Sequence, residues 1–298
     1  MEIRTLKYFL AVAREEGVNR AADALHVTQP TLSRQMAQLE DELGVKLFER
    51  GARRISLTTE GFFFRRRAEE ILSLVEKTEQ EISMQTIDIE GRISIGCGEL
   101  SAVGFLPNIF REFNEKYPLV KYDIFTATAD LIKEQLEKGL VDMGVLLEPV
   151  DLEKFDFIRL KKKESWVARM RKDDPLAKKK GVTANDLLER PLIVPRRANV
   201  QSELAAWFGD SFSRAKILFT SNLSTNSAIM VLAGLGISIG VEVHSNIWDK
   251  SKIVSVPLSP VFASNSVFAW KKSHSFSPAA EKFIAMVRDK FADGGEGD

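Results

Sequence analysis

Apolar residues recur at three- and four-residue spacing in the N-terminal part of the chain, a pattern that predicts amphipathic helices. The first helix covers residues 3–16, and Gly17 ends it. A second, short helix at about 20–26 follows, and Asn19 is its expected N-cap. Its packing face is made of small alanines, which let a neighbouring helix approach closely.

A third helix and a pair of short strands complete the pattern of a winged helix-turn-helix. Thr28 is the expected N-cap of the third helix. Pro30 lies in its first turn, where a missing N–H costs nothing, and Gly44 ends it. Residues 45–57 carry apolar positions on both sides of a turn that contains Gly51, which predicts a β-hairpin.

A long helix is predicted to begin after Thr58 or Thr59, with apolar positions at alternating spacings of four and three. These positions are Phe64, Ala68, Ile71, Val75, Thr78 and Ile82. A heptad seam on a lone helix would be exposed to water, so we expect two copies of the chain to pair along it as a dimer. Gly91 marks the end of this linker helix.

From residue 92 onward, strand and helix patterns alternate, which predicts a parallel sheet with helices. After the basic segment 161–164 the series resumes, so we expect a second α/β lobe. The strand at 266–270 and the last helix return to the first lobe, and residues 294–298 form a frayed tail. The expected boundaries are 1–60 for the winged helix-turn-helix, 61–90 for the linker helix and 91–298 for the α/β domain, with lobe I at about 91–163 and 266–298 and lobe II at about 164–265.

Composition restricts the possible functions. The 298 residues are 44% hydrophobic and 28% charged, within the range of soluble globular proteins. Lys and Arg total 42, as do Asp and Glu, so any surface for a polyanion must be local. The single cysteine, Cys97, cannot form an intramolecular disulfide, which favours a reducing, cytoplasmic setting. The uncharged stretch 217–241 is too polar to span a bilayer, so we expect no membrane segment.

The third helix carries side chains suited to a DNA groove. Its expected exposed residues are Gln29, Thr31, Ser33, Arg34 and Gln38. Arginine can pair with guanine and glutamine with adenine through two hydrogen bonds each. Residues 43–67 hold seven Lys or Arg against two acids, which supplies a local positive patch. The alternative is a purely structural helical domain with solvated arginines.

Three segments closely resemble the LysR-type transcriptional regulators. They are VNRAADALHVTQPTLSRQ at 18–35, LEDELGVKLFER at 39–50 and LTTEG at 57–61. Later landmarks at 93–96, 106–107 and 234–237 are similar to the effector domain of that family. The resemblance therefore covers nearly the whole chain.

The resemblance implies an N-terminal all-α winged helix-turn-helix with a linker helix, and a C-terminal α/β two-lobed effector domain like a type 2 periplasmic binding protein. It also implies binding to promoter DNA, a homodimer or a homotetramer built as a dimer of dimers, and a small-molecule effector in the cleft without a cofactor. RNA polymerase is a further expected partner. The expected DNA-binding residues are Arg20, Thr28, Gln29, Pro30, Thr31, Ser33, Arg34, Gln38, Arg50, Arg53 and Arg54.

The cleft can also be located from the expected topology. Ligands of such folds bind at the C-terminal ends of parallel strands and at helix N-termini. The expected effector-binding residues are Glu99, Leu100, Ser101, Thr128, Leu147, Arg196 and Asn222. Ser101 and Thr128 match positions where the family often places hydroxyls on an effector carboxylate, although plain helix capping is an equal alternative. Arg196 or Arg197 could hold an anion, whereas Glu99 leaves an amine-bearing or neutral ligand open.

Other reactive side chains give weaker signals. Cys97 follows a strand beside the cleft, but a buried structural thiol is a simpler interpretation than a redox sensor. His26, His244 and His274 are scattered, without metal-ligand spacing. An enzyme with a fused helix-turn-helix would need a nucleotide-binding or nucleophile motif that the sequence lacks, so we expect no catalytic activity. A purely architectural DNA-binding protein would not require so large an α/β domain.

Overall fold

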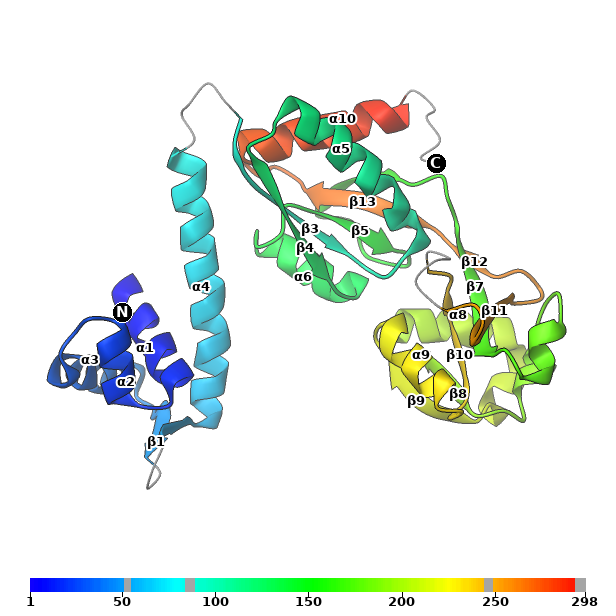
Figure 1. Cartoon of the computed structure of the whole chain (residues 1–298), viewed down its shortest axis with the longest axis horizontal. Helices are drawn as coiled ribbons and strands as arrows, with labels where there is room; N and C mark the ends of the chain where they lie inside the picture. Colours follow the sequence, from blue (N-terminus) through cyan, green and yellow to red (C-terminus); the bar gives the residue numbers. More distant parts are fainter. Residues whose placement is uncertain (51–54, 84–88, 244–248, 293–298) are drawn as a thin grey trace. The chain divides into compact units, whose positions relative to one another are not determined.

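The computed structural model describes residues 1–50, 55–83, 89–243 and 249–292 (Figure 1). The chain divides into two compact units, Met1–Gln85 and Thr86–Asp298. The predicted wing residues Arg53 and Arg54, the imidazole of His244 and the tail at 294–298 lie outside the described residues, as do the side chains of Arg50 and Ile82.

The first unit is a winged helix-turn-helix followed by a long helix. Its elements are α1 (Ile3–Glu15), α2 (Val18–Ala24), α3 (Gln29–Leu43), β1 (Phe48–Arg50), β2 (Ile55–Leu57) and α4 (Thr59–Ser83). Strands β1 and β2 pair antiparallel. The ring of Phe9 contacts those of Phe48 and Phe64, at 5.1 and 4.8 Å between centroids. These contacts join α1, the wing and α4 around one core.

The ends of α1 and α3 lie within one residue of the predicted ends, whereas the N-cap of α2 differs. Gly17, not Asn19, is the N-cap of α2, because Gly17 has extended backbone and its carbonyl accepts the first helical hydrogen bond, from Ala21, at 3.1 Å. Thr28 is the N-cap of α3, but its hydroxyl bonds the Thr31 hydroxyl at 2.8 Å rather than a backbone N–H. Gly44 ends α3 with a φ of 69°, a left-handed conformation that favours glycine.

The predicted heptad seam on α4 is wrong at its N-terminal end. Phe64 packs edge-on against Phe9, and Ala68 is fully buried, so both belong to the core of their own unit. Phe63, Ile71 and Leu74 instead form an exposed apolar stripe, with 65%, 39% and 45% of their surfaces accessible. At helical spacing these three residues share one side of α4.

The second unit begins with a five-stranded sheet in the order β4-β3-β5-β13-β6. The strands are β3 (Gly91–Cys97), β4 (Val120–Thr126), β5 (Met143–Leu147), β6 (Phe155–Arg159) and β13 (Ser266–Lys271). Strands β3, β4 and β5 are parallel, and β13 runs antiparallel to both of its neighbours. The associated helices are η1 (Ser101–Phe105), α5 (Leu106–Lys116), α6 (Ala129–Glu137) and α10 (Pro278–Ala292). We call this sheet and its helices lobe I.

Lobe II surrounds a second sheet in the order β11-β7-β10-β8-β9. Its strands are β7 (Glu164–Arg171), β8 (Leu192–Pro195), β9 (Ile217–Ser221), β10 (Ile237–Val241) and β11 (Ile253–Pro257), and the short β12 (Ala263–Ser264) pairs with β7. Its helices are η2 (Pro175–Lys178), α7 (Ala184–Leu187), α8 (Ala198–Phe208), η3 (Gly209–Arg214) and α9 (Ser224–Leu232). Strands β8, β9 and β10 are parallel, whereas β7 is antiparallel to β10 and β11.

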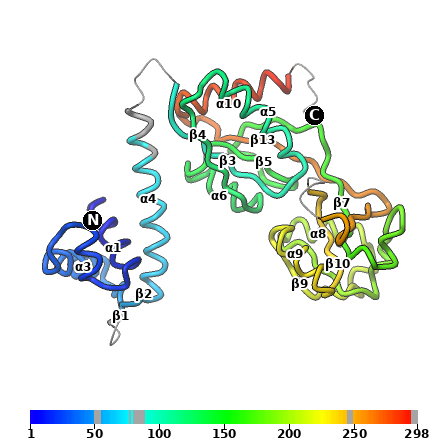
Figure 2. The backbone as a smooth tube through the Cα atoms, in the orientation of Figure 1, coloured from blue at the N-terminus to red at the C-terminus, as the bar shows by residue number. Residues whose placement is uncertain are grey.

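Two chain segments connect the lobes, one from β6 into β7 and one from β12 into β13 (Figure 2). They are hydrogen-bonded neighbours where they cross, since Ala263 pairs with Ser165 and Ser264 with Glu164. The indole Nε1 of Trp166 also donates to the Ser264 hydroxyl at 2.9 Å. The chain therefore passes between the lobes twice, side by side.

Candidate nucleic-acid interface and ligand cleft

Helix α3 presents a polar face because its apolar residues are used in the core. Leu32, Met36 and Leu39 are buried. The expected base-reading positions Gln29, Pro30, Thr31, Arg34 and Gln38 are exposed, and Ser33 is half-buried. No hydrogen bond or ion pair of the Arg34 side chain exists within the described part of the chain. The guanidinium of Arg34 is thus available for an external acceptor.

Other expected DNA-binding residues have partners within the unit. The Nε of Arg20 donates to the Glu15 carbonyl oxygen at 2.8 Å, which joins the start of α2 to the end of α1. The amide Nε2 of Gln38 donates to Oε1 of Glu42 at 3.4 Å. The Arg20 contact joins two helices and the Gln38 contact lies within α3, and both leave the side chains of Arg20 and Gln38 at the surface.

Glu40 anchors the wing to α3, a role the sequence does not predict. Its Oε1 accepts the backbone N–H groups of Leu47 and Phe48, at 2.8 and 3.2 Å, and Oε2 lies 2.7 Å from the Lys46 ammonium. Partial burial of the carboxyl opposes its ionisation, but these hydrogen bonds outweigh burial and lower the pKa of Glu40. The start of β1 is therefore held by an ionised side chain of the recognition helix.

Because the folded state lowers the pKa of Glu40, its ionised form stabilises the fold above the unfolded-state pKa, and this contribution is lost as pH falls through the folded-state pKa. We expect Glu40→Gln to lower the unfolding free energy of the first unit by about 1.5 kcal/mol at pH 7. The difference should shrink below about pH 4. Scanning calorimetry of the full chain at both pH values measures it.

Glu49→Gln is the matched control, because the side chain of Glu49 is exposed and makes no hydrogen bond within the described residues. An equal effect of the two substitutions at pH 7 would contradict the anchoring role of Glu40.

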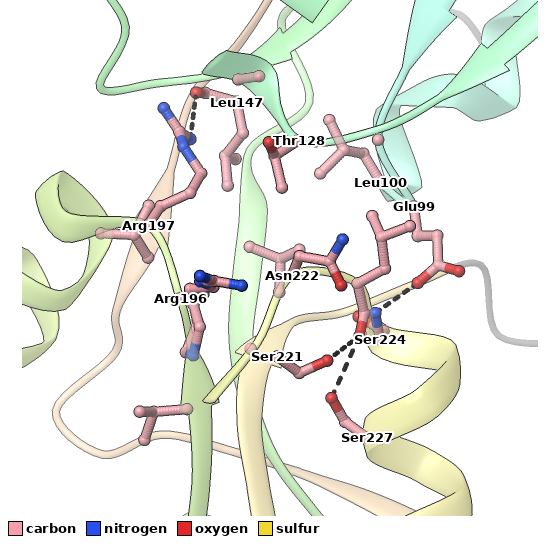
Figure 3. A pocket seen from close by; sticks show the side chains of 18 of the residues that line it. Glu99, Leu100, Thr128, Leu147, Arg196, Arg197, Ser221, Asn222, Ser224 and Ser227 are labelled. Carbon is pink, nitrogen blue, oxygen red and sulfur yellow. Dashed lines mark hydrogen bonds between the residues drawn. The ribbon is translucent and has the colours of Figure 1, made fainter. Parts of the chain in front are cut away.

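A cavity of about 90 Å³ lies between the lobes and contains six of the seven expected effector-binding residues. These are Glu99, Leu100, Thr128, Leu147, Arg196 and Asn222. Figure 3 shows Thr128, Arg196 and Asn222 projecting from different elements toward the space between the lobes. Thr128 is the N-cap residue of α6, but its side chain makes no capping hydrogen bond, so its hydroxyl is not committed to capping.

Ser101 is the expected effector-binding residue that does not line the cavity. Its N–H and hydroxyl both donate to Oε2 of Glu164, at 3.0 and 2.8 Å. The other oxygen of Glu164 accepts the N–H of Ala102 at 2.7 Å and the Ser266 hydroxyl at 3.3 Å. A buried carboxylate of this chain therefore already uses the donors that we expected Ser101 to offer to an effector.

Glu99 and Arg197 form contacts across the cleft. Glu99 of lobe I accepts the N–H groups of Ser224 and Thr225, at 2.5 and 3.0 Å, and so caps the N-terminus of α9 in lobe II (Figure 3). Arg197 of lobe II donates to both carboxylate oxygens of Asp130, at 3.0 and 2.8 Å, and to the Leu147 carbonyl at 3.2 Å. Arg196 is exposed, and its side chain makes no contact of this kind within the described residues.

Cys97 lies in β3, and 3% of its surface is accessible. Burial raises the pKa of the Cys97 thiol, which lowers the thiolate fraction needed for redox chemistry. Among the described residues there is no cluster of His, Cys, Asp and Glu that could hold a metal ion. None of the described helices is both long and apolar enough to cross a membrane.

Both units match models of protein families. The model described as "Bacterial regulatory helix-turn-helix protein, lysR family" matches residues 3–62, and that described as "LysR substrate binding domain" matches residues 88–292. The transcriptional regulator YybE of Bacillus subtilis is 30% identical over 295 residues, covering 98% of this chain and 100% of the relative. The Hca operon transcriptional activator HcaR of Escherichia coli is 29% identical over 299 residues, covering 98% and 99%.

Among solved structures, full-length CbnR complexed with its target DNA is similar, with a TM-score of 0.75 and 25% identity, over 97% of this chain and 99% of that chain. The relatives are thus named as regulators of transcription rather than as enzymes, and the two-lobed second unit corresponds to a substrate-binding domain.

Proposed function

Since the chain belongs to the LysR family of bacterial transcriptional regulators, we propose that α3 reads promoter DNA and that a small molecule in the cleft modulates this binding. The observation that carries the proposal is the presence, in one chain, of an exposed polar face on α3 and of a mostly apolar cavity between two lobes that also carries a few polar side chains. A regulator of this kind needs no cofactor and no catalytic group.

On DNA, we assign base contacts to Gln29, Thr31 and Arg34, because their side chains are exposed on the polar face of α3. Thr28, Pro30, Ser33 and Gln38 border these positions and would contact the backbone or base methyl groups. Arg20 and the wing arginines Arg50, Arg53 and Arg54 supply positive charge for phosphates.

Self-association through α4 brings two reading helices to one operator. The exposed stripe of Phe63, Ile71 and Leu74 is the surface we assign to the dimer. A tetramer formed from two dimers, contact with RNA polymerase and a cytoplasmic location belong to the same proposal.

For the effector, we assign Thr128, Arg196 and Asn222 as the polar contacts at the mouth of the cleft, with Leu100 and Leu147 as apolar contacts. The hydroxyl of Thr128 and the guanidinium of Arg196 are the groups suited to a carboxylate. The effector would act by favouring one arrangement of the lobes, in proportion to its difference in affinity for the two arrangements.

The proposal is tested by footprinting the DNA beside the protein's own gene and measuring affinity for the protected sequence by fluorescence anisotropy at fixed salt. We expect Arg34→Ala to weaken binding to that sequence by about 1–3 kcal/mol, because a contact to one base pair is lost. Binding to a scrambled duplex should change much less.

Arg111→Ala is the matched control, since Arg111 is an exposed arginine of α5 in the second unit. Equal losses on the protected and scrambled duplexes for Arg34→Ala would refute its base-reading role.

A further inference from the structure

The cleft contains a buried cation that pairs with no acidic side chain of the described residues. Arg169 of β7 is 1% exposed and lines the cavity. Within the described residues its guanidinium makes a single hydrogen bond, from Nη2 to the Val241 carbonyl oxygen. Its Nε is buried without any acceptor. Buried charges are ordinarily paired, so this guanidinium lacks the partner its location requires.

The neighbouring strand β10 leaves space for the side chain of Arg169. Ser238 is the cross-strand partner of Arg169, so both side chains lie on the same face of the sheet. The Ser238 hydroxyl is likewise buried without a hydrogen-bond partner. A Cβ atom added to Gly240 would come within 3.3 Å of Nη1 of Arg169, so glycine leaves the space that the guanidinium occupies.

The remaining charges of the cavity do not neutralise Arg169. Arg197 is already paired with Asp130, whereas Arg196 is exposed and has no acidic partner in the part of the chain that the structure describes. Glu99 is the acid among the lining residues, and its carboxylate is bound to the N-terminus of α9. Burial lowers the pKa of Arg169, and the charges of Glu242 and Glu99 oppose this effect without contacting the guanidinium. The cavity therefore has an excess of positive charge in its interior.

We propose that the cleft binds an oxyanion, such as a carboxylate, sulfate or phosphate group, and that this group pairs with Arg169 in the interior of lobe II. The inference rests on the proposed effector-binding function and deepens it. Thr128 and Arg196 contact the ligand at the mouth of the cleft, and Arg169 neutralises its charge inside. An unpaired Arg169 carries an electrostatic cost, which a bound anion removes.

The experiment measures the thermal unfolding midpoint of the full chain in sodium sulfate and in sodium chloride of equal ionic strength. We compare the wild type with Arg169→Met, and with Arg171→Met as the matched control. Arg171 lies on the same strand but is exposed and paired with Asp173. Sulfate stabilises proteins generally, without binding to a particular site. The gain of Arg169→Met in sulfate measures that general effect.

Two results are expected. In chloride, Arg169→Met has a midpoint equal to or above that of the wild type, because an unpaired buried charge is removed. In sulfate, the wild type and Arg171→Met gain about 3 °C or more beyond the gain of Arg169→Met, because only they bind the anion. Arg169→Lys should restore part of this gain, and Glu99→Gln should lower the sulfate concentration for half-maximal gain.

The proposal requires both results. A lower midpoint of Arg169→Met in chloride would make Arg169 a structural cation, and equal sulfate gains in wild type and Arg169→Met would mean that no anion pairs with it. Either result overturns the inference. Neither affects the test of DNA reading by Arg34, so failure of this inference and failure of the proposed function are distinguishable.

Discussion

Glu164→Ala is expected to lower the unfolding free energy of the second unit by about 3 kcal/mol or more. Glu164 is fully buried and accepts hydrogen bonds from Ser101, Ala102 and Ser266. Removing the carboxylate leaves these buried donors without acceptors and creates a cavity. Ser101 and Ala102 begin the η1–α5 segment, where a negative charge is favourable, so the loss includes that stabilisation.

Urea denaturation of the full chain, followed by tryptophan fluorescence, measures this loss because Trp166 lies two residues away in β7. Glu164→Gln keeps the volume and one acceptor oxygen, so its loss should be intermediate. Glu189→Ala is the exposed control and should cost less than about 0.5 kcal/mol. A loss for Glu164→Ala no larger than this control would show that its hydrogen bonds do not stabilise the unit.

The double variant Ile71→Asp/Leu74→Asp is expected to dissociate the regulator into monomers and weaken operator binding by about 100-fold or more. Both side chains lie on the exposed stripe of α4, and carboxylates there would be desolvated and would repel each other in a dimer. Separate monomers lose the increase in operator affinity that comes from two linked reading helices. Sedimentation velocity gives the mass, and anisotropy on the same sample gives the affinity.

Ser73→Asp is the control on α4, because Ser73 is exposed and at helical spacing points away from the stripe. It should leave the oligomer intact. An unchanged mass for the double variant would place the interface elsewhere.

The error in the heptad seam has a physical origin. Phe64 and Ala68 repeat with the spacing of a coiled coil, but the same spacing serves a helix that packs on its own domain. Deciding between the two requires the position of Phe9, which the pattern along α4 does not contain. The helix itself and its start near Thr58 could be predicted, because both depend on local sequence.

The strands β6 and β11 could not be predicted for a related reason. Each lies at the edge of its sheet and is short, with charged or partly exposed residues, so its own pattern is weak. Pairing with β13 and β7, far along the chain, defines them. Central strands such as β5 and β10 are buried apolar runs and were predictable from sequence.

The buried charge of Arg169 in the cleft is only weakly indicated by the sequence pattern. Arg169 alternates with the apolar residues Trp166, Ala168 and Met170 of β7, and such alternation ordinarily predicts an exposed side chain. Helix α9 covers that face of the sheet, which turns an expected surface arginine into a buried one. Residues in the connecting loops, such as Thr128 and Asn222, could be predicted because topology alone places them at the cleft.

The two chain segments that connect the lobes lie side by side, in the manner of a hinge between two domains. Because Ser264 and Glu164 are paired where the two segments cross, the covalent connection between the lobes is confined to this one pair of neighbouring segments. The contacts of Glu99 with α9 and of Arg197 with Asp130 lie across the cleft and connect lobe I to lobe II. A rotation that moves the lobes apart would therefore have to break the contacts of Glu99 with α9 and of Arg197 with Asp130.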